Sequence, residues 1–195
     1  MIDWPGYYSG TSDREPRPLA VRGADLVGTP GRAVDVGSGA GLESAYLLGR
    51  GWRVLAVDAQ QAAADRLAEL APPGAEDRLE VRIADFGDLT DLPPAELVHS
   101  SYSLPFCPPD AFGRLWDAVT GCLVPGGVLA VNLFGDRDTW AQDPDSGLTF
   151  HTRADVDRLL AGLDVVELEE EENDLPAYSG PKHWHLFQIL ARRPA

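Results

Sequence analysis

The sequence predicts an α/β fold in which a mostly parallel sheet has helices on both faces and ends in an antiparallel hairpin. From about Arg32 onward, short apolar runs alternate with amphipathic segments of helical period, as in a chain of β-α units. Several of these runs are continuously apolar, which is typical of strands buried on both faces of a parallel sheet. The last two runs have no helical segment between them, so they predict an antiparallel pair.

Five β-α units followed by this hairpin account for the expected elements. A glycine stop at Gly51 and a Thr152-to-Asp155 capping box mark helix ends. The expected strands cover residues 32–36, 52–57, 79–84, 95–101, 128–134, 163–168 and 184–191, and the expected helices cover residues 19–27, 42–50, 59–70, 110–123 and 152–160.

Composition narrows the function. A chain of 195 residues suits one domain, with a core in residues 29–195 and a lid or accessory helix in residues 1–28. Its apolar runs fall short of the roughly 18 residues of a membrane span, and its amino terminus lacks a signal sequence, so we expect a cytoplasmic protein. The net charge of −15 argues against nucleic acid and anionic membranes as partners. A small-molecule partner is favoured, for a monomer or a homodimer. The two cysteines have neither the number nor the spacing of a disulfide framework or zinc site.

A glycine loop joins the first strand of the core to the next helix. Within Asp35-Val36-Gly37-Ser38-Gly39-Ala40-Gly41, the glycines allow a tight turn and close approach of a ligand to the backbone. The helix behind the loop offers unpaired N–H groups to that ligand. A plain strand-to-helix turn would show the same pattern, so the loop alone does not identify a site.

Two carboxylates strengthen the interpretation, because Asp58 and Asp85 end consecutive strands at the edge where parallel sheets bind ligands. The first is placed to accept both hydroxyls of a ribose. The second is placed to accept an adenine amino group, with Phe86 lining the ring pocket. A phosphate-binding loop would need Gly-Lys-Ser/Thr, but the only lysine is Lys182. The pattern therefore favours an adenosine-containing ligand.

With these motifs, residues 32–192 resemble the class I S-adenosylmethionine-dependent methyltransferases. The resemblance rests on the acidic glycine motif, Asp58, Asp85, the Leu123-to-Gly127 segment and the terminal hairpin. It implies a Rossmann-like, seven-stranded sheet whose last strand is antiparallel, with S-adenosylmethionine as cofactor. Asp35 and Gly37 would lie near the methionine part, Asp58 would hold the ribose, and Asp85 with Phe86 would face adenine. The rest of the expected cofactor set is Ser38, Gly39, Gly41, Ala59 and Ser101.

The acceptor is less well indicated. Residues 98–106, Val-His-Ser-Ser-Tyr-Ser-Leu-Pro-Phe, depart from the Asn/Asp-Pro-Pro-Tyr/Phe motif of amino-group methyltransferases that act on nucleic acids and glutamine. They look more like small-molecule enzymes, including the tellurite-resistance-like branch. The expected reaction is methyl transfer to an oxygen, nitrogen or sulfur nucleophile. An NAD(P)-dependent oxidoreductase, a non-catalytic cofactor-binding regulatory domain, and another group transfer or cyclisation on the same fold stay open.

Candidates for proton transfer come from several segments. His183 and His185 open the last strand on one shared face, and either is a possible base. Tyr102 and Asp136 are further catalytic candidates. Asp136 and Asp138 are also possible ligands of a divalent ion, but no complete ligand set is evident, so no metal is expected. An aromatic and arginine-rich segment at the amino terminus is expected to cover the cofactor, with an arginine on the methionine carboxylate; it contains Trp4, Tyr7, Tyr8, Arg14 and Arg17.

Overall fold

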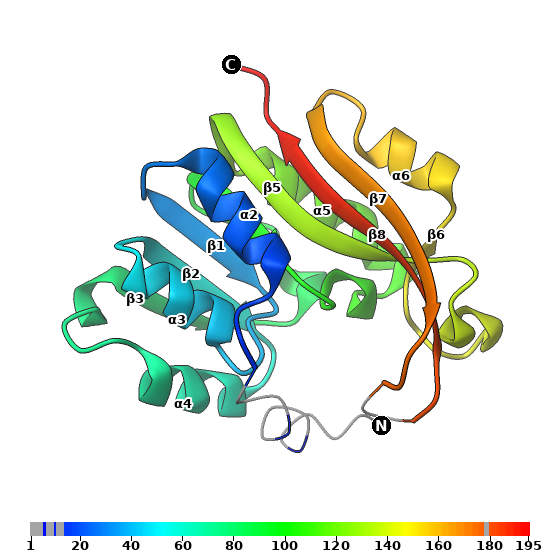
Figure 1. Cartoon of the computed structure of the whole chain (residues 1–195), viewed down its shortest axis with the longest axis horizontal. Coiled ribbons are helices and arrows are strands. Elements are labelled where there is room, and N and C mark those ends of the chain that lie inside the picture. Colours follow the sequence, from blue (N-terminus) through cyan, green and yellow to red (C-terminus); the bar gives the residue numbers. More distant parts are fainter. Residues whose placement is uncertain (1–5, 7–9, 11–13, 178–179) are drawn as a thin grey trace.

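The computed structural model describes residues 6, 10, 14–177 and 180–195, and its described part is built around one eight-stranded sheet (Figure 1). The order along the sheet is β3-β2-β1-β4-β5-β8-β7, and the short β6 pairs with β5. The strands are β1 Arg32–Val36, β2 Arg53–Asp58, β3 Leu79–Ile83, β4 Ala95–Ser100, β5 Leu123–Gly135, β6 Phe150–His151, β7 Asp164–Asp174 and β8 His183–Arg192.

The helices have nearly the predicted bounds. The capping box that opens α6 is present, since the Thr152 side chain accepts from the Asp155 backbone and the Asp155 side chain accepts in return. The α-helices are α2 Pro18–Val27, α3 Leu42–Gly49, α4 Gln61–Leu70, α5 Pro109–Gly121 and α6 Arg153–Leu159, and the 3₁₀ turns are η1 Glu76–Arg78, η2 Phe86–Asp88, η3 Leu104–Phe106 and η4 Thr139–Gln142.

The predicted sheet class is confirmed. Strands β3, β2, β1, β4 and β5 are parallel, whereas β8 runs antiparallel to both β5 and β7. In Figure 1, β5, β8 and β7 form a long curved ribbon. The eighth strand, β6, was not predicted, because a two-residue strand is too short to show a hydrophobic period.

Two further details differ from the prediction. Pro125-Gly126-Gly127 is not a turn before the fifth strand but a bulge within β5, where the register against β4 jumps from Ala95↔Leu123 to Leu97↔Val128. Gly126 takes a φ of 78° there. No α-helix joins β3 to β4, so five full β-α units are too many. That segment holds only η2 before Pro93-Pro94, and proline stops a helix.

Side chains of alternate strand residues bury against helices on opposite faces of the sheet. On β1, Ala33 belongs to the cluster under α2, α3 and α4, and Val34 belongs to the cluster that packs against α5 and α6. Figure 1 shows α2 and α3 in front of the sheet and α5 behind it. Both faces of the central strands β1, β2 and β4 are therefore largely buried.

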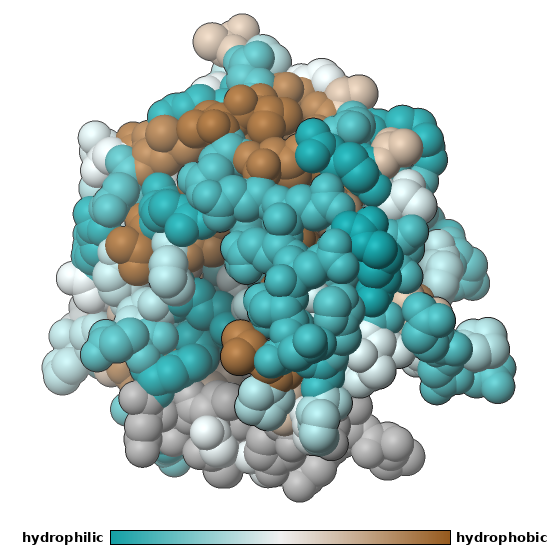
Figure 2. Space-filling model, turned by 45° about the vertical axis from the view of Figure 1, so that its right-hand side comes forward, coloured by the Kyte–Doolittle hydropathy of each residue, from teal (hydrophilic) through white to brown (hydrophobic). Residues whose placement is uncertain are grey.

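The strand β7 closes the far side of the sheet as an exposed acidic edge. Glu169, Glu170, Glu172 and Asp174 are exposed, and such charges discourage further strand pairing. The space-filling view in Figure 2 is mostly hydrophilic, with apolar patches toward its upper part. In the part of the chain that the structure describes, none of the helices has the length and apolar character needed to span a membrane.

Candidate functional site

A large cavity of about 960 Å³ lies where the parallel strands end. Its lining comes from segments that follow β1, β2, β3 and β4, from the end of β5 and from the β7–β8 hairpin. Nine of the ten predicted cofactor residues line it, together with Tyr102: Asp35, Gly37, Ser38, Gly39, Asp58, Ala59, Asp85, Phe86 and Ser101. Gly41, Asp136, His183 and His185 do not line it.

The glycine loop is held rigidly against the neighbouring strand. The backbone N–H groups of Gly37 and Ser38 donate to the carbonyl of Val57 at 2.7 and 3.0 Å. Gly37 has a φ of 75°, and a Cβ there would overlap the Ser103 side chain. The loop therefore needs glycine at this position both for its backbone angle and for the space beside it.

The last glycine of the motif has a packing role. Gly41 is the N-cap residue of α3 with a φ of 83°, and a Cβ on it would come within 3.0 Å of Leu67 on α4. It lets two helices approach closely and does not reach the cavity. The motif pattern alone cannot separate a ligand-facing glycine from a packing one, since both need the same backbone freedom.

Asp58, the last residue of β2, is hydrogen-bonded to the glycine loop. Its two carboxylate oxygens accept backbone N–H groups from Gly39 and Gln60, each at 2.9 Å. These bonds orient a side chain that is 7% exposed and lies at the cavity. Asp85 and Phe86, which follow β3, complete this half of the lining.

A buried hydrogen-bonded chain runs from β1 to β4. Asp35 and His99 are cross-strand neighbours, and Asp35 Oδ1 lies 2.9 Å from His99 Nδ1. Asp35 Oδ2 accepts from the hydroxyl of Ser44 at 2.6 Å. On its other side, His99 Nε2 lies 2.8 Å from Ser101 Oγ. Asp35 and His99 are each 1% exposed, whereas Ser101 is half-buried at the cavity.

His99 was not among the predicted site residues. Alternation puts it on the same face of the chain as Ser101, but its place beside Asp35 comes from the register between β1 and β4, which the sequence pattern does not give.

Glu43 is a second cavity residue that sequence reasoning missed. Both oxygens of its carboxylate accept from the guanidinium of Arg14, at 2.5 and 2.9 Å, and Oε1 also accepts from the backbone N–H of Arg17. Burial raises the pKa of Glu43, but the Arg14 hydrogen bonds and the nearby His99 outweigh it, and the pKa falls to about 2. Arg14 and Arg17 line the cavity as predicted for the amino-terminal segment. Trp4, Tyr7 and Tyr8 of that prediction lie outside the described residues.

Aromatic side chains form the opposite wall of the cavity. Their rings contact one another edge-on or tilted, with centroids 5.6 to 6.4 Å apart. Tyr102 is held in the left-handed region, with a φ of 56°, while its N–H donates to the Asn132 side chain at 2.6 Å. The guanidinium carbon of Arg17 lies 4.2 Å from the centre of the Tyr102 ring. The wall consists of Tyr102, Phe106, Phe134, Trp140 and Trp184.

A buried ion pair supports this wall from behind. Lys182 Nζ pairs with Asp138 and lies 3.7 Å from the centroid of a Trp140 ring and 4.3 Å from that of Trp184. Both charged side chains are almost fully buried. Burial lowers the pKa of Lys182, and the bond to Asp138 opposes that shift. Asp138, considered above as a possible metal ligand, forms this ion pair and accepts from the Trp140 backbone N–H at the start of η4.

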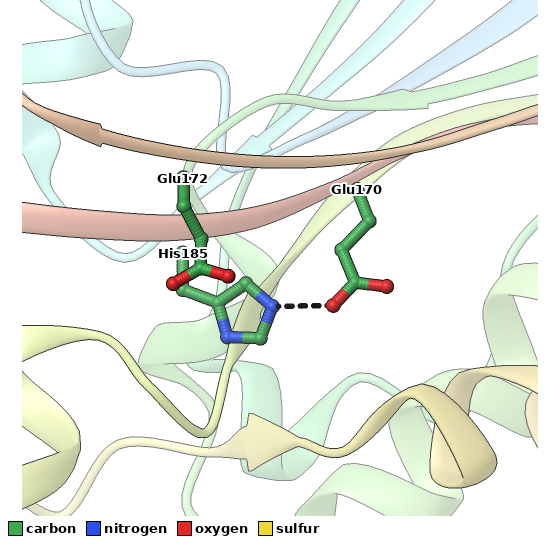
Figure 3. Close-up of side chains that lie close together, drawn as sticks. All are labelled: Glu170, Glu172 and His185. Atoms are coloured by element: carbon green, nitrogen blue, oxygen red, sulfur yellow. Dashed lines mark hydrogen bonds and ion pairs between the residues drawn. The ribbon is translucent and has the colours of Figure 1, made fainter.

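The histidines of β8 share a face, as predicted, but that face points away from the cavity. Trp184 and Leu186 alternate with them and face it instead. His185 instead contacts the edge strand β7 (Figure 3). Its Nε2 atom lies 3.1 Å from Glu170 Oε1, and Glu172 lies beside it. His183 bonds to Asp174 and Glu172, and both bonds raise its pKa. Neither histidine is placed to act as a base in the cavity.

Glu170, Glu172 and His185 lie close enough together to hold a metal ion, but the guanidinium of Arg137 already neutralises the two carboxylates. The guanidinium of Arg137 lies 2.6 Å from Glu172 and 2.7 Å from Glu170. Its hydrogen bond, together with that of His183, lowers the pKa of Glu172 to about 2. Asp136 is exposed beside Arg137, outside the cavity, so it too is misplaced for the predicted catalytic role.

Comparison with known proteins identifies the domain. Residues 33–127 match the family model of a methyltransferase domain. This match assigns residues 33–127 to a methyltransferase domain. A search of curated proteins found no match to this chain.

Solved structures show the same fold at low sequence identity. TehB from Haemophilus influenzae is 16% identical, with a TM-score of 0.78 over 97% of this chain and 67% of TehB. The 1,6-didemethyltoxoflavin-N1-methyltransferase of Burkholderia thailandensis, solved with 1,6-didemethyltoxoflavin and S-adenosylhomocysteine bound, is 21% identical, with a TM-score of 0.71 over 99% of this chain and 86% of its own. The [4+2]-cyclase SpnF is 17% identical, with a TM-score of 0.67 over 91% of this chain and 80% of its own.

The cavity has groups that suit S-adenosylmethionine, the donor that the resemblance implies. Gly37 lines it without a side chain and so leaves room for Ser103, whose hydroxyl donates to the Gly37 carbonyl. Asp58 and Asp85 offer carboxylate acceptors for hydroxyl and amino groups. At the strand ends the charged side chains of the lining are the carboxylates Asp35, Asp58 and Asp85, which suit a nucleoside with a cationic sulfonium better than a phosphate ester.

Proposed function

We propose that the enzyme methylates an oxygen, nitrogen or sulfur nucleophile on a small molecule with a flat, apolar body. The observation that supports this most is the division of one 960 Å³ cavity into a polar half and an aromatic half. Pockets for single small ligands range from about 300 to 1,000 Å³, so this volume is at the upper end and suits a donor and an acceptor together.

In this proposal the polar half holds the donor. Asp58, fixed by Gly39 and Gln60, accepts the ribose hydroxyls. Asp85 accepts the adenine amino group, and Phe86 covers the ring. Asp35 and Gly37 lie near the methionine part, and Arg17, whose guanidinium lies over Tyr102 at the cavity, is the arginine proposed to bind its carboxylate.

The aromatic half holds the acceptor. Phe106, Trp140 and Trp184 present apolar ring surface, and edges and faces of aromatic rings pack favourably on a flat ligand. The Arg17 guanidinium over Tyr102 closes the junction between the two halves. A bulky polymer would not enter a cavity of this size, which is why a small acceptor is favoured.

In this proposal the main role of the protein in catalysis is to align the acceptor with the methyl group. S-adenosylmethionine supplies an already activated methyl group. The chain's own residues orient the acceptor behind that methyl and exclude water, and good alignment of two reactants lowers a barrier by about 7–11 kcal/mol. A base is needed only for an acceptor that arrives protonated.

An acceptor screen tests the proposal. The purified chain is incubated with methyl-labelled S-adenosylmethionine and matched pairs of flat and saturated acceptors: phenols with cyclohexanols, anilines with cyclohexylamines, and thiophenols with cyclohexanethiols. We expect label in the aromatic member of at least one pair. Trp184→Ala should raise KM for that acceptor about tenfold, since an aromatic contact is worth about 0.5–1.5 kcal/mol. Affinity for S-adenosylhomocysteine, measured by calorimetry, is the internal control and should not change.

The other readings predict different results in the same experiments. A non-catalytic domain would bind S-adenosylhomocysteine and label nothing, and a cyclase would convert a substrate without consuming the donor. Tight binding of NAD(H) without binding of S-adenosylmethionine would mean an oxidoreductase. The expected cytoplasmic location and the oligomeric state stay predictions.

A further inference from the structure

Three residues at the cavity are joined by hydrogen bonds that binding of the methyl donor does not by itself require. Asp35, His99 and Ser101 are linked in series by hydrogen bonds of 2.9 and 2.8 Å. The first two are buried, and the last lies at the cavity beside Tyr102 of the aromatic wall. We propose that Ser101 is a catalytic residue that takes the proton of the acceptor nucleophile and relays it to His99, which Asp35 positions. This inference rests on the proposed methyl transfer to a small acceptor.

The hydrogen-bond partners of Asp35 and His99 determine the direction in which a proton can move, from Ser101 to His99. Asp35 accepts from Ser44 through one oxygen and faces His99 through the other, so the carboxylate is used as an acceptor on both sides. The Nδ1 atom of His99 must then carry the hydrogen. Its Nε2 atom is left as an acceptor for the Ser101 hydroxyl, and Ser101 Oγ can in turn accept a hydrogen bond from a ligand. In hydrolases the same order of serine, histidine and aspartate lets the histidine accept the proton of the serine hydroxyl.

The charged groups around His99 stabilise the product of this transfer. Asp35 faces it from β1, and Glu43 lies close enough on α3 that His99 contributes to lowering the Glu43 pKa. Arg14 neutralises much of the Glu43 charge through its two hydrogen bonds. On β5, the register partner of His99 is Ala130, which carries no charge. An imidazolium at this position is therefore next to one full carboxylate and one compensated carboxylate.

The step balances within the reaction already assigned. The acceptor's O–H, N–H or S–H bond breaks and its proton passes to Ser101 Oγ, while the proton of the Ser101 hydroxyl moves to His99 Nε2. The acceptor lone pair forms the new bond to the methyl carbon, and the electron pair of the carbon–sulfur bond stays on sulfur. His99 leaves the step as imidazolium and returns its proton to water after the product departs. The serine is not alkylated or acylated.

The Asp35–His99–Ser101 relay also limits the class of acceptor. Such a relay speeds the reaction only when the nucleophile still carries its proton at the pH of the reaction, as a phenol or an alcohol does. A phenol has a pKa of about 10, so it keeps its proton at neutral pH. An acceptor that is already an anion gains nothing from it. The inference therefore favours hydroxylated aromatic acceptors over thiolates.

The first test reads the histidine directly and needs no acceptor. Long-range proton–nitrogen NMR of the full chain labelled with ¹⁵N-histidine reports the tautomer of each of the four histidines, with His99→Gln providing the assignment. We expect His99 as the Nδ1–H tautomer, with Nε2 unprotonated at neutral pH. An Nε2–H tautomer, or an imidazolium that persists through neutral pH, would overturn the relay even if methyl transfer is found.

The second test separates proton transfer from positioning. Phenol and 4-nitrophenol are compared as acceptors, because the latter ionises more readily and can arrive as an anion. Ser101→Ala should lower kcat for phenol about a hundredfold, the ordinary size of general-base catalysis, and affect 4-nitrophenol much less. Ser101→Thr, which keeps the hydroxyl, should restore most of the phenol rate.

His99→Gln should remove the acidic limb from the pH profile of phenol methylation. Equal losses for both acceptors, or an unchanged pH profile, would show a structural role and contradict the relay. Binding of S-adenosylhomocysteine to each variant is measured by calorimetry, so that a loss of donor site is distinguished from a loss of proton transfer.

Discussion

Asp58 illustrates how one residue serves fold and site at once. Its carboxylate accepts two backbone N–H groups, one from the glycine loop and one from the turn after β2. These bonds hold the oxygens at the cavity in a fixed orientation before any ligand arrives. A preorganised acceptor of this kind loses little entropy on binding, and hydrogen bonds to a charged group contribute about 1.5–3 kcal/mol.

Asp58→Ala should therefore weaken binding of S-adenosylhomocysteine by at least about tenfold, or about 1.4 kcal/mol. Calorimetry with S-adenosylhomocysteine and its 2′,3′-dideoxy analogue separates the ribose contact from loop distortion. The native chain should prefer the natural ligand, and the variant should lose that preference. Asp65→Asn, an exposed change on α4, is the matched control. An Asp58 variant that still distinguishes the two ligands would show that another residue holds the ribose.

At the scale of the element, strand alternation explains both what the sequence predicted and where it failed. Continuous apolar runs and helical periods are local properties, so β1 to β4 and the capped helix α6 were predicted nearly to their bounds, whereas β5 begins five residues before the expected position 128. Alternation also placed His183 and His185 on one face. It could not say which face, because both faces of β8 carry buried apolar residues and the cavity lies on the one that holds Trp184.

The site residues divide in the same way. Asp58 and Asp85 follow strands and were predicted from their position, whereas His99 lies inside β4 and acquires its role from the register with Asp35. Register between strands that are distant in sequence depends on tertiary packing, and local pattern does not contain it.

The junction of β5 and β8 depends on the buried pair of Lys182 and Asp138. Removing one partner of a buried pair leaves an uncompensated charge, at a cost of about 3–5 kcal/mol. Lys182→Met should lower the free energy of unfolding by that amount in urea denaturation. The double variant Lys182→Met with Asp138→Leu should recover most of it, since the charge is then gone. A single variant as stable as the native chain would mean that the pair is not desolvated as described.

At the scale of the whole molecule, the balance of charge is strongly acidic. The chain has 31 acidic and 16 basic side chains, and the exposed edge strand β7 concentrates part of the excess. Most carboxylates at the surface are solvated and titrate without much effect on stability. The few that are buried and paired are the ones through which acid should act on the fold, and Glu43 is the clearest of them, with a side chain that is 5% exposed.

Glu43 should make the stability of the whole chain depend on acid pH. Its pKa is about 2 in the folded chain against an ordinary 4.5, so its stabilising contribution is full above pH 4.5 and disappears as the pH falls toward 2. A depression of this size corresponds to roughly 3 kcal/mol. Urea unfolding of the native chain and Glu43→Gln, from about pH 6 to about pH 3, should show a stability difference that shrinks steadily with acid. Glu69→Gln, which breaks the exposed ion pair with Arg66, should show no such trend. A difference between the native chain and Glu43→Gln that stays constant with pH would mean that the Glu43 carboxylate titrates alike in the folded and unfolded chain, and that the Arg14 contact does not hold it ionised.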